Sequence, residues 1–212
     1  MSRREFASAA RALRAARAVR VPRRAAEECA LMLVLYAGYP GALEGLRVLH
    51  DTWPGRTRAR DVGAPSAWRT KGKRLCARIY GPAYPKLVAA VGTLHPDLAT
   101  WMIEHGYGRV LARGGLTVRA RELVTVSALA ALGWERQLVS HVLGARRVGA
   151  SIAVVGEALR IGAAHGDATA QAVAARTWDR AGRTGALAGT PRVASAKPAP
   201  RRKSLHPNAT GH

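Results

Sequence analysis

A glutamate and a histidine with the potential for proton transfer occur 19 residues apart in a strongly apolar segment of this 212-residue chain. Glu122 shares a helical face with Val126 and Leu129, the face that we expect to be buried. A carboxylate there must be hydrogen-bonded or neutral, because an unpaired buried charge is costly. His141 borders the apolar stripe of the following segment, since it lies three residues after Leu138. We therefore expect the fold to bring the two side chains together.

Gly133 lies between the two residues, 11 positions after Glu122 and 8 before His141, and predicts a helix end followed by a turn. If the two helices fold back antiparallel, a rise of about 1.5 Å per residue places the side chains within about one turn in height. A carboxylate facing an imidazole between apolar helices forms a proton relay, and shifted pKa values are the expected consequence. The spacing alone leaves a second interpretation open, in which a structural hydrogen bond holds the hairpin together.

The elements that must position this pair are predicted to be helices throughout. Thr117 is a suitable N-cap for the helix that carries Glu122 and ends at Leu132, and His141 belongs to a helix over 134–148. The other predicted helices cover residues 3–19, 22–37, 40–50, 73–80, 84–91, a longer stretch from His95, and 151–163. β-Branched residues are scattered without an alternating run that would indicate a sheet. The fold class is therefore all-α, a compact helical bundle.

The composition limits the expected cellular location and the classes of binding partner. The formal charge is +21, from 34 basic against 13 acidic residues, and 29 of the basic residues are Arg. Such a chain binds polyanions in a salt-dependent way, but no motif for specific nucleic-acid recognition is present. Two cysteines, Cys29 and Cys76, form neither a C-x-x-C pair nor a metal cluster, so we expect no metal and a reducing, cytoplasmic location. No apolar run is long enough to cross a membrane.

Several short motifs resemble the carboxymuconolactone decarboxylase family, which includes the alkylhydroperoxidase D-like proteins. They are Arg121-Glu122-Leu123, Ala-Leu-Ala-Ala-Leu-Gly ending at Gly133, Gln137-Leu138, Ser140-His141, Gly144-Ala145 and Val148-Gly149-Ala150. The segment Tyr36-Ala37-Gly38-Tyr39-Pro40-Gly41-Ala42 is similar to the stretch that follows the catalytic hairpin in the family, although here it precedes the hairpin. The resemblance is good over 94–162 and weaker over 27–49.

The resemblance implies the type of bundle and a division of the chain. Residues 1–53 are predicted to be N-terminal helices that resemble a family half-unit, 54–72 a linker, and 73–166 the domain with the catalytic hairpin. Residues 167–212 are expected to be weakly ordered to disordered, with a disordered basic tail over 185–212. Assembly into a homo-oligomer, a trimer or hexamer, is also implied. Through the tail we expect non-specific contact with nucleic acid.

The resemblance also implies a chemistry and a set of site residues. The peroxidase branch of the family needs a C-x-x-C pair, whose two places fall on Trp134 and Gln137, so peroxiredoxin activity is not expected. The thiol-free branch implies a cofactor-independent decarboxylase for a small carboxylated lactone or oxo-acid. His141 would then be the acid–base group and Glu122 its partner.

Around this catalytic pair, the resemblance implies further residues that contact the substrate. They are Trp134 and Gln137 in the pocket lining, Arg121 and Arg146 as carboxylate clamps, and Tyr107 at the substrate. A non-catalytic oligomeric scaffold, or a polyanion-binding protein that keeps the hairpin, is the alternative from another class.

Overall fold

A computed structural model describes residues 3–59 and 63–183 of the chain. Over these residues every regular element is a helix and no strand occurs, which confirms the predicted all-α fold class. In the same ranges no helix combines the length and the apolar content that crossing a bilayer requires. The basic tail predicted over 185–212 lies outside the described residues.

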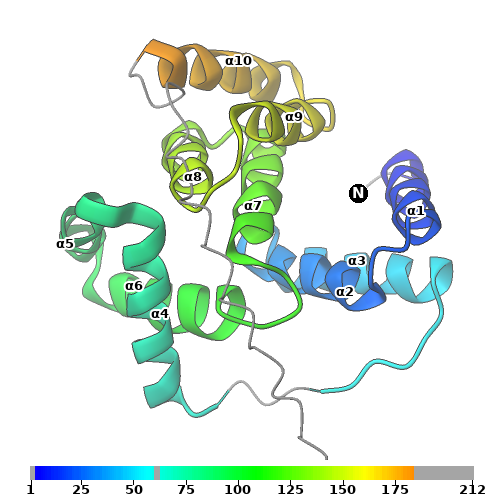
Figure 1. The fold of residues 1–212 in the computed structure, drawn as a ribbon, viewed down its shortest axis with the longest axis horizontal. Coiled ribbons are helices and arrows are strands. Elements are labelled where there is room, and N and C mark those ends of the chain that lie inside the picture. Colours follow the sequence, from blue (N-terminus) through cyan, green and yellow to red (C-terminus); the bar gives the residue numbers. More distant parts are fainter. Residues whose placement is uncertain (1–2, 60–62, 184–212) are drawn as a thin grey trace, which may run out of the picture.

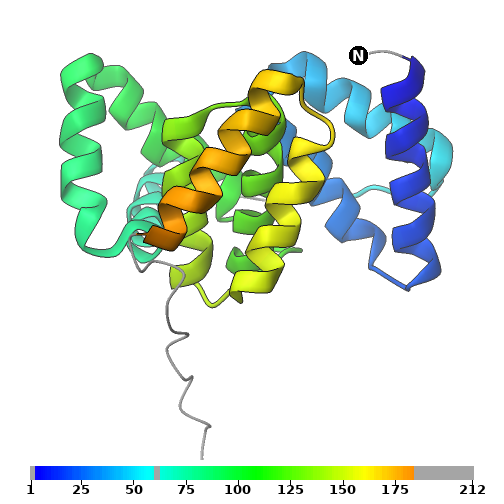
Figure 2. The ribbon, with the colours of Figure 1, turned by 90° about the horizontal axis from the view of Figure 1, so that it is seen from above.

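The helices form three groups, with the last four helices in the middle of the molecule (Figures 1 and 2). The central group holds α7 (Val118–Leu132), α8 (Glu135–Arg147), α9 (Ile152–Ala163) and α10 (Ala168–Arg183). On one side lies an N-terminal arm of α1 (Arg3–Ala18), α2 (Arg23–Met32), the short 3-10 helix η1 (Leu33–Leu35) and α3 (Gly38–Thr52). On the other side lie α4 (Pro65–Tyr80), η2 (Gly81–Ala83), α5 (Tyr84–Leu94), α6 (Pro96–Trp101) and η3 (Met102–Leu111).

The hairpin of α7 and α8 has the helix ends that the sequence predicted. Thr117 is the N-cap of α7, and its side chain accepts a hydrogen bond from the backbone N–H of Ala120. Gly133 ends the helix in a left-handed conformation, with φ of 68°, which a residue with a side chain rarely adopts. Ser151 caps α9 by accepting from the N–H of Val154. Thr117 and Gly133 fix where α7 begins and ends, and so fix the height of Glu122 relative to the turn that leads to His141.

The linker predicted over 54–72 is wrong in its second half, because α4 already begins at Pro65. Two glycines explain the error. A Cβ atom on Gly72 would lie 1.9 Å from the carbonyl oxygen of Ile103, and one on Gly108 would lie 2.1 Å from that of Trp68. These glycines let α4 and η3 pack backbone against backbone, whereas in the sequence Gly72 looked like a helix breaker.

The helix predicted from His95 changes type along its length. His95 caps α6, since its Nδ1 accepts from the N–H of Asp97, but from Met102 to Leu111 the chain is a π-helix. A π-helix has a wider turn than an α-helix, so it is not recognised by a search for 3.6-residue periodicity. It places Ile103, Tyr107 and Leu111 in the core against α4.

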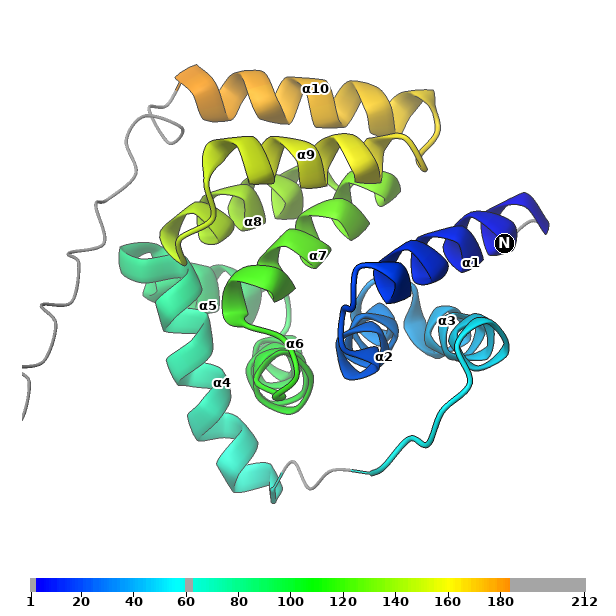
Figure 3. The same ribbon diagram turned by 45° about the vertical axis from the view of Figure 1, so that its right-hand side comes forward.

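The prediction that residues from 167 onward lack firm order is wrong for 168–183, which form α10. Figure 3 shows α10 lying alongside α9 on the outer side of the central group. Its buried residues are small and partly polar: Ala170, Val173, Ala174, Thr177 and Ala181. This stripe is made mainly of alanines and was not recognised in the sequence as a core-facing stripe, although it packs closely against α7, α8 and α9.

Two apolar clusters form the core, and α7 contacts both. One joins α7, α8, α9 and α10 around Val126, Leu138 and Val155. The other joins α4 and η3 around Ile79 and Tyr107, and Val118 and Val124 of α7 pack against it. The candidate pair therefore lies on helices that are held on both sides.

Candidate functional site

Glu122 and His141 meet between α7 and α8 and form a buried hydrogen bond. Glu122 is 0 % exposed and His141 is 8 % exposed. The imidazole Nδ1–H donates to the carboxylate oxygen Oε2 of Glu122 over 2.9 Å. A carboxylate can only accept, so this bond fixes the tautomer and leaves Nε2 as the free ring nitrogen. The hydrogen bond expected from the sequence is present, whereas the catalytic role of the pair and the cavity expected beside it stay predictions.

The carboxylate of Glu122 is held tightly from the α8 side. Gly144 lies one turn beyond His141, and a Cβ atom there would come within 2.7 Å of both Oε2 of Glu122 and Cγ2 of Ile79. The glycine therefore makes room for the acid. The second carboxylate oxygen, Oε1, is buried and has no hydrogen-bond partner within the described residues. An unsatisfied buried oxygen costs free energy, so this atom calls for an explanation.

Two tyrosines extend the hydrogen-bonded chain from the other nitrogen of the imidazole. The hydroxyl of Tyr80, at the end of α4, lies 3.5 Å from Nε2 of His141. The hydroxyl of Tyr107, on the π-helix, donates to that of Tyr80 over 3.2 Å. Burial raises the pKa of Tyr80 to about 12, and the negative charge of Glu122 contributes to this shift. Tyr80 therefore keeps its proton at neutral pH, and its hydroxyl can donate a hydrogen bond to Nε2.

The N-terminal arm also reaches this site, through Tyr36 at the end of η1. Its hydroxyl makes a short hydrogen bond to the Oγ1 of Thr125, which in turn donates to the carbonyl of Arg121 over 2.9 Å. Burial raises the pKa of Tyr36 well above its ordinary value, and the charge of Glu122 adds to the effect. The surroundings of Glu122 thus come from three separate parts of the chain: the arm, α4 with η3, and the central hairpin.

A comparison with known families matches residues 96–180 to the sequence model of the Carboxymuconolactone decarboxylase family. The matched segment runs from the start of α6 into α10 and contains both Glu122 and His141. Residues 96–180 are therefore similar to a carboxymuconolactone decarboxylase domain. A search of curated proteins gave no match. Tyr36 and Tyr80 lie outside the matched segment, so the candidate site includes residues that precede it.

The two places where a redox pair would lie in this domain are at the beginning of α8. Trp134 is the N-cap residue of α8 and is 48 % exposed, and Gln137 is also exposed, one turn before His141. Both side chains are open to solvent within two turns of His141. Tyr107, which was also predicted to contact a substrate, is buried and hydrogen-bonded to Tyr80. Its contact with the site is therefore through Tyr80.

The thiols do not replace the missing redox pair. Cys76 is fully buried in α4, and burial raises its pKa to about 12. Burial also raises the pKa of Cys29, despite the opposing positive charge of Arg121. Both thiols stay protonated near neutral pH, whereas the nucleophile in thiol chemistry is the thiolate. Among the described residues, no three His, Cys, Asp or Glu side chains are grouped as metal ligands would be.

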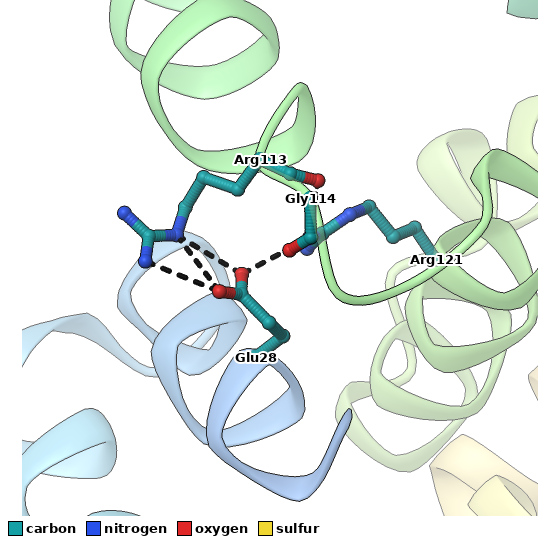
Figure 4. Close-up of polar contacts among 4 residues, drawn as sticks. All are labelled: Glu28, Arg113, Gly114 and Arg121. Atoms are coloured by element: carbon teal, nitrogen blue, oxygen red, sulfur yellow. Dashed lines mark hydrogen bonds and ion pairs between the residues drawn. The ribbon is translucent and has the colours of Figure 1, made fainter. Parts of the chain in front are cut away.

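Arg121 and Arg146, predicted as substrate clamps, have structural partners. Figure 4 shows Glu28 of α2 between Arg113 and Arg121. Nη2 of Arg121 donates to Oε2 of Glu28 over 3.0 Å and to the carbonyl of Arg113 over 2.7 Å. Nη1 of Arg146 donates to the carbonyl of Ala150 over 2.6 Å, beyond the end of α8. Because these guanidinium groups hold the backbone and the arm in place, neither is retained in the proposal below.

Sequence reasoning missed Tyr80 and Thr125 and did not give Tyr36 a role at the site. Tyr36 belongs to the family-like Tyr-Ala-Gly-Tyr-Pro motif, and this motif was the available signal for it. Tyr80 precedes Gly81-Pro82 at the end of a helix, a place where tyrosine carries no special meaning. Its partner His141 is 61 residues away, and such a long-range contact has no local signature.

Proposed function

We propose that this protein is a cofactor-independent acid–base enzyme, a lyase of the decarboxylase type for a small carboxylated lactone or oxo-acid. The observation that carries the proposal is the buried Glu122–His141 hydrogen bond, which orients Nε2 of the imidazole away from the carboxylate and toward Tyr80. The decarboxylase family match over 96–180 supports the same class of reaction. The exposed face at Trp134 and Gln137 supplies the approach for a substrate.

The chemistry assigns a distinct task to each group. When the bond to the departing carboxylate breaks, its electron pair stays on the substrate carbon and carbon dioxide leaves. Nε2–H of the His141 imidazolium then delivers a proton to that carbon. The ionised Glu122 stabilises the imidazolium and keeps the ring in one orientation. Tyr80 donates a hydrogen bond toward Nε2 when the ring is neutral and so holds the ring in position until a proton from solvent restores the imidazolium.

The experiment that tests this function is a turnover assay on a panel of small lactones and oxo-acids that bear carboxylates. Carbon dioxide release and incorporation of solvent deuterium at the product carbon are measured together. Glu122→Gln and His141→Gln should each lower kcat by about 10²-fold or more, the range for loss of a general acid–base group. The double variant should lose little more, because residues that act as one unit are not additive.

A matched control separates this chemistry from thiol chemistry. Cys29→Ser should leave turnover intact, since no redox pair is formed. Peroxide reduction that is lost in Cys29→Ser would contradict the proposal. A second contradicting result is an absence of turnover across the panel together with unchanged melting temperature in the presence of every compound, which would favour the scaffold or polyanion-binding alternative.

Self-association is part of the same proposal. Leu94, Leu98 and Trp101 of α5 and α6 are 79 %, 45 % and 63 % exposed. Neighbouring exposed apolar side chains of this size are typical of contact surfaces. We propose that they form a contact between copies of the chain, with sedimentation of wild type and Trp101→Glu as the measurement.

A further inference from the structure

A pocket lies between the N-terminal arm and the π-helix, and its lining includes neither Glu122 nor His141. Its volume is about 270 Å³. One wall comes from α2, η1 and α3 and is apolar, formed by Leu31, Val34, Tyr39, Ala42, Leu43 and Leu46. Tyr39 and Leu43 form part of this wall although they are 67 % and 62 % exposed. An apolar surface left open in this way gains stability when an apolar body covers it.

The opposite wall comes from η3 and the residues that follow it, and it is cationic. His105, Arg109 and Arg113 line it at intervals of four residues, whereas Tyr107 of the same helix faces the core. Arg109 lies over the ring of Trp68 at 5.1 Å and has no ion pair within the described part of the chain. No carboxylate is among the residues that line the pocket.

Arg113 has an acidic partner, but this partner does not neutralise the positive charge of the wall. It binds Glu28, but Arg121 binds the same carboxylate, so two guanidinium charges share one negative charge. The pocket therefore presents an excess of positive charge on one side and an apolar surface on the other. An anion that carries an apolar body matches both walls at once.

We propose that this pocket is a second ligand site, which binds a small monocarboxylate with an aromatic or aliphatic body. The carboxylate lies against Arg109 and His105, where a guanidinium and an imidazolium can both donate hydrogen bonds to it. The body covers Leu43 and Leu46. The site is separate from the proposed reaction at Glu122 and His141 and does not depend on it.

The protonation of His105 gives the site a measurable property. Burial, and then the positive charge of Arg109, lower the pKa of His105. The other charged or titratable groups at this place are Arg113, Glu28 behind it, and Tyr39 from the arm. A bound carboxylate favours the charged imidazole, so binding raises the pKa of His105. By linkage, affinity is higher at about pH 5.5, where more of the imidazole is protonated, than at about pH 8.

Benzoate is the probe, and benzamide is its neutral counterpart of the same shape. Titration calorimetry should show that benzoate binds and that benzamide binds at least about threefold more weakly, the effect of about 0.7 kcal/mol for a partly exposed charge pair. Arg109→Gln should weaken benzoate binding by a similar factor. Arg47→Gln is the matched control, because it removes one exposed positive charge of α3 outside this pocket.

Nuclear magnetic resonance locates the binding. The imidazole signal of His105, assigned by its loss in His105→Gln, should shift with benzoate, and its titration should move to higher pH. Equal affinities for benzoate and benzamide would overturn the proposal. So would equal losses in Arg109→Gln and Arg47→Gln, which would indicate attraction by net charge. Benzoate binding that is lost in Glu122→Gln but kept in Arg109→Gln would place it at the other site and would also overturn the proposal.

Discussion

Glu28 and Glu122 are both buried carboxylates, yet their surroundings differ in kind. Glu28 accepts hydrogen bonds on both oxygens from Arg113, over 3.0 to 3.3 Å, and a further one from Arg121. Burial alone would raise its pKa, but these hydrogen bonds outweigh burial and hold the pKa of Glu28 below its ordinary value. Glu122 has one bond, to His141, and its Oε1 atom has no partner within the described residues.

This difference favours a structural role for Glu28 and a role in proton transfer for Glu122, although both contacts involve one helix, α7. Arg121 and Glu122 are neighbours in α7, but Arg121 reaches the arm and Glu122 reaches α8. The first contact saturates a carboxylate with permanent cations and so ties two parts of the fold together. The second leaves a carboxylate bound to an imidazole instead of to a permanent cation. A saturated ion pair suits a structural role, and a sparsely bonded one suits proton transfer.

The largest expected effect comes from removing Glu28. Glu28→Ala leaves Arg113 and Arg121 without their carboxylate, and Arg121 is only 2 % exposed. Loss of one partner from a buried pair should lower the free energy of unfolding by about 3 to 5 kcal/mol. Urea unfolding measures the loss. Glu44→Ala is the control, because Glu44 pairs with Arg47 on the surface, and it should change stability by less than about 0.5 kcal/mol.

The acid limb of the stability curve gives an independent measurement of the same contact. The folded-state pKa of Glu28 is lowered, so its contribution is present above the ordinary value of 4.5 and is lost as the pH falls through the lowered pKa. Glu28→Gln should therefore lose less stability than wild type between about pH 4.5 and pH 3. Parallel acid limbs in the two proteins would contradict this assignment.

A smaller effect is expected on the other side of the comparison. His141→Ala removes the hydrogen-bond partner that Glu122 has among residues 3–59 and 63–183, and should lower the free energy of unfolding by about 1 to 3 kcal/mol, the cost of an unsatisfied buried group. Glu122→Gln should cost less, because the amide oxygen can still accept from the imidazole. Urea unfolding of the two variants beside Glu28→Ala tests the ranking. A loss in His141→Ala that equals that of Glu28→Ala would show that both carboxylates serve stability alike.

The sequence predicted one of these carboxylates well and the other poorly, for a physical reason. Glu122 and His141 lie on adjacent helices joined by one turn, so helical rise and a glycine stop are enough to bring them together. Glu28 and its partners are 85 and 93 residues apart, and nothing local marks them. The family resemblance suggested Arg121 as a carboxylate clamp without indicating its structural partner Glu28.

The same distinction explains which elements were predicted. Helices with caps and apolar stripes, such as α7 and α9, were predicted close to their ends. The π-helix has a different period, and the first half of α4 contains Gly72, which reads as a breaker until its packing against Ile103 is known. In both cases a tertiary contact decides the local structure, which a search along one chain does not detect.

Gly144 offers a way to disturb Glu122 without removing any polar group. In Gly144→Ala the new methyl group would lie 2.7 Å from Oε2 of Glu122 and from Cγ2 of Ile79. Overpacking should lower the free energy of unfolding by about 1 to 2 kcal/mol and should also reduce turnover, because the acid is displaced from His141. Gly106→Ala is the matched control on the π-helix. Its Cβ atom meets nothing within 4 Å, so stability should be unchanged or slightly higher.

The smallest expected effect concerns the second contact between the arm and α7, from Tyr36 to Thr125. It is neutral, whereas the contact from Glu28 to Arg121 is ionic. Tyr36→Phe removes one hydroxyl, and Thr125 keeps its bond to the carbonyl of Arg121, so no buried donor is stranded. The loss should be about 0.5 to 1.5 kcal/mol, well below that of Glu28→Ala.

Urea unfolding of Tyr36→Phe beside Tyr39→Phe measures this difference. Tyr39 is 67 % exposed and should change stability by less than about 0.5 kcal/mol. Of the two polar contacts between the arm and α7, the ionic one would then contribute more to stability, and Tyr36 would serve chiefly to close the site around Glu122. In that case Tyr36→Phe should lower turnover more than its small loss of stability accounts for. A loss of stability as large as that of Glu28→Ala, with unchanged turnover, would instead make Tyr36 a second structural anchor of the arm.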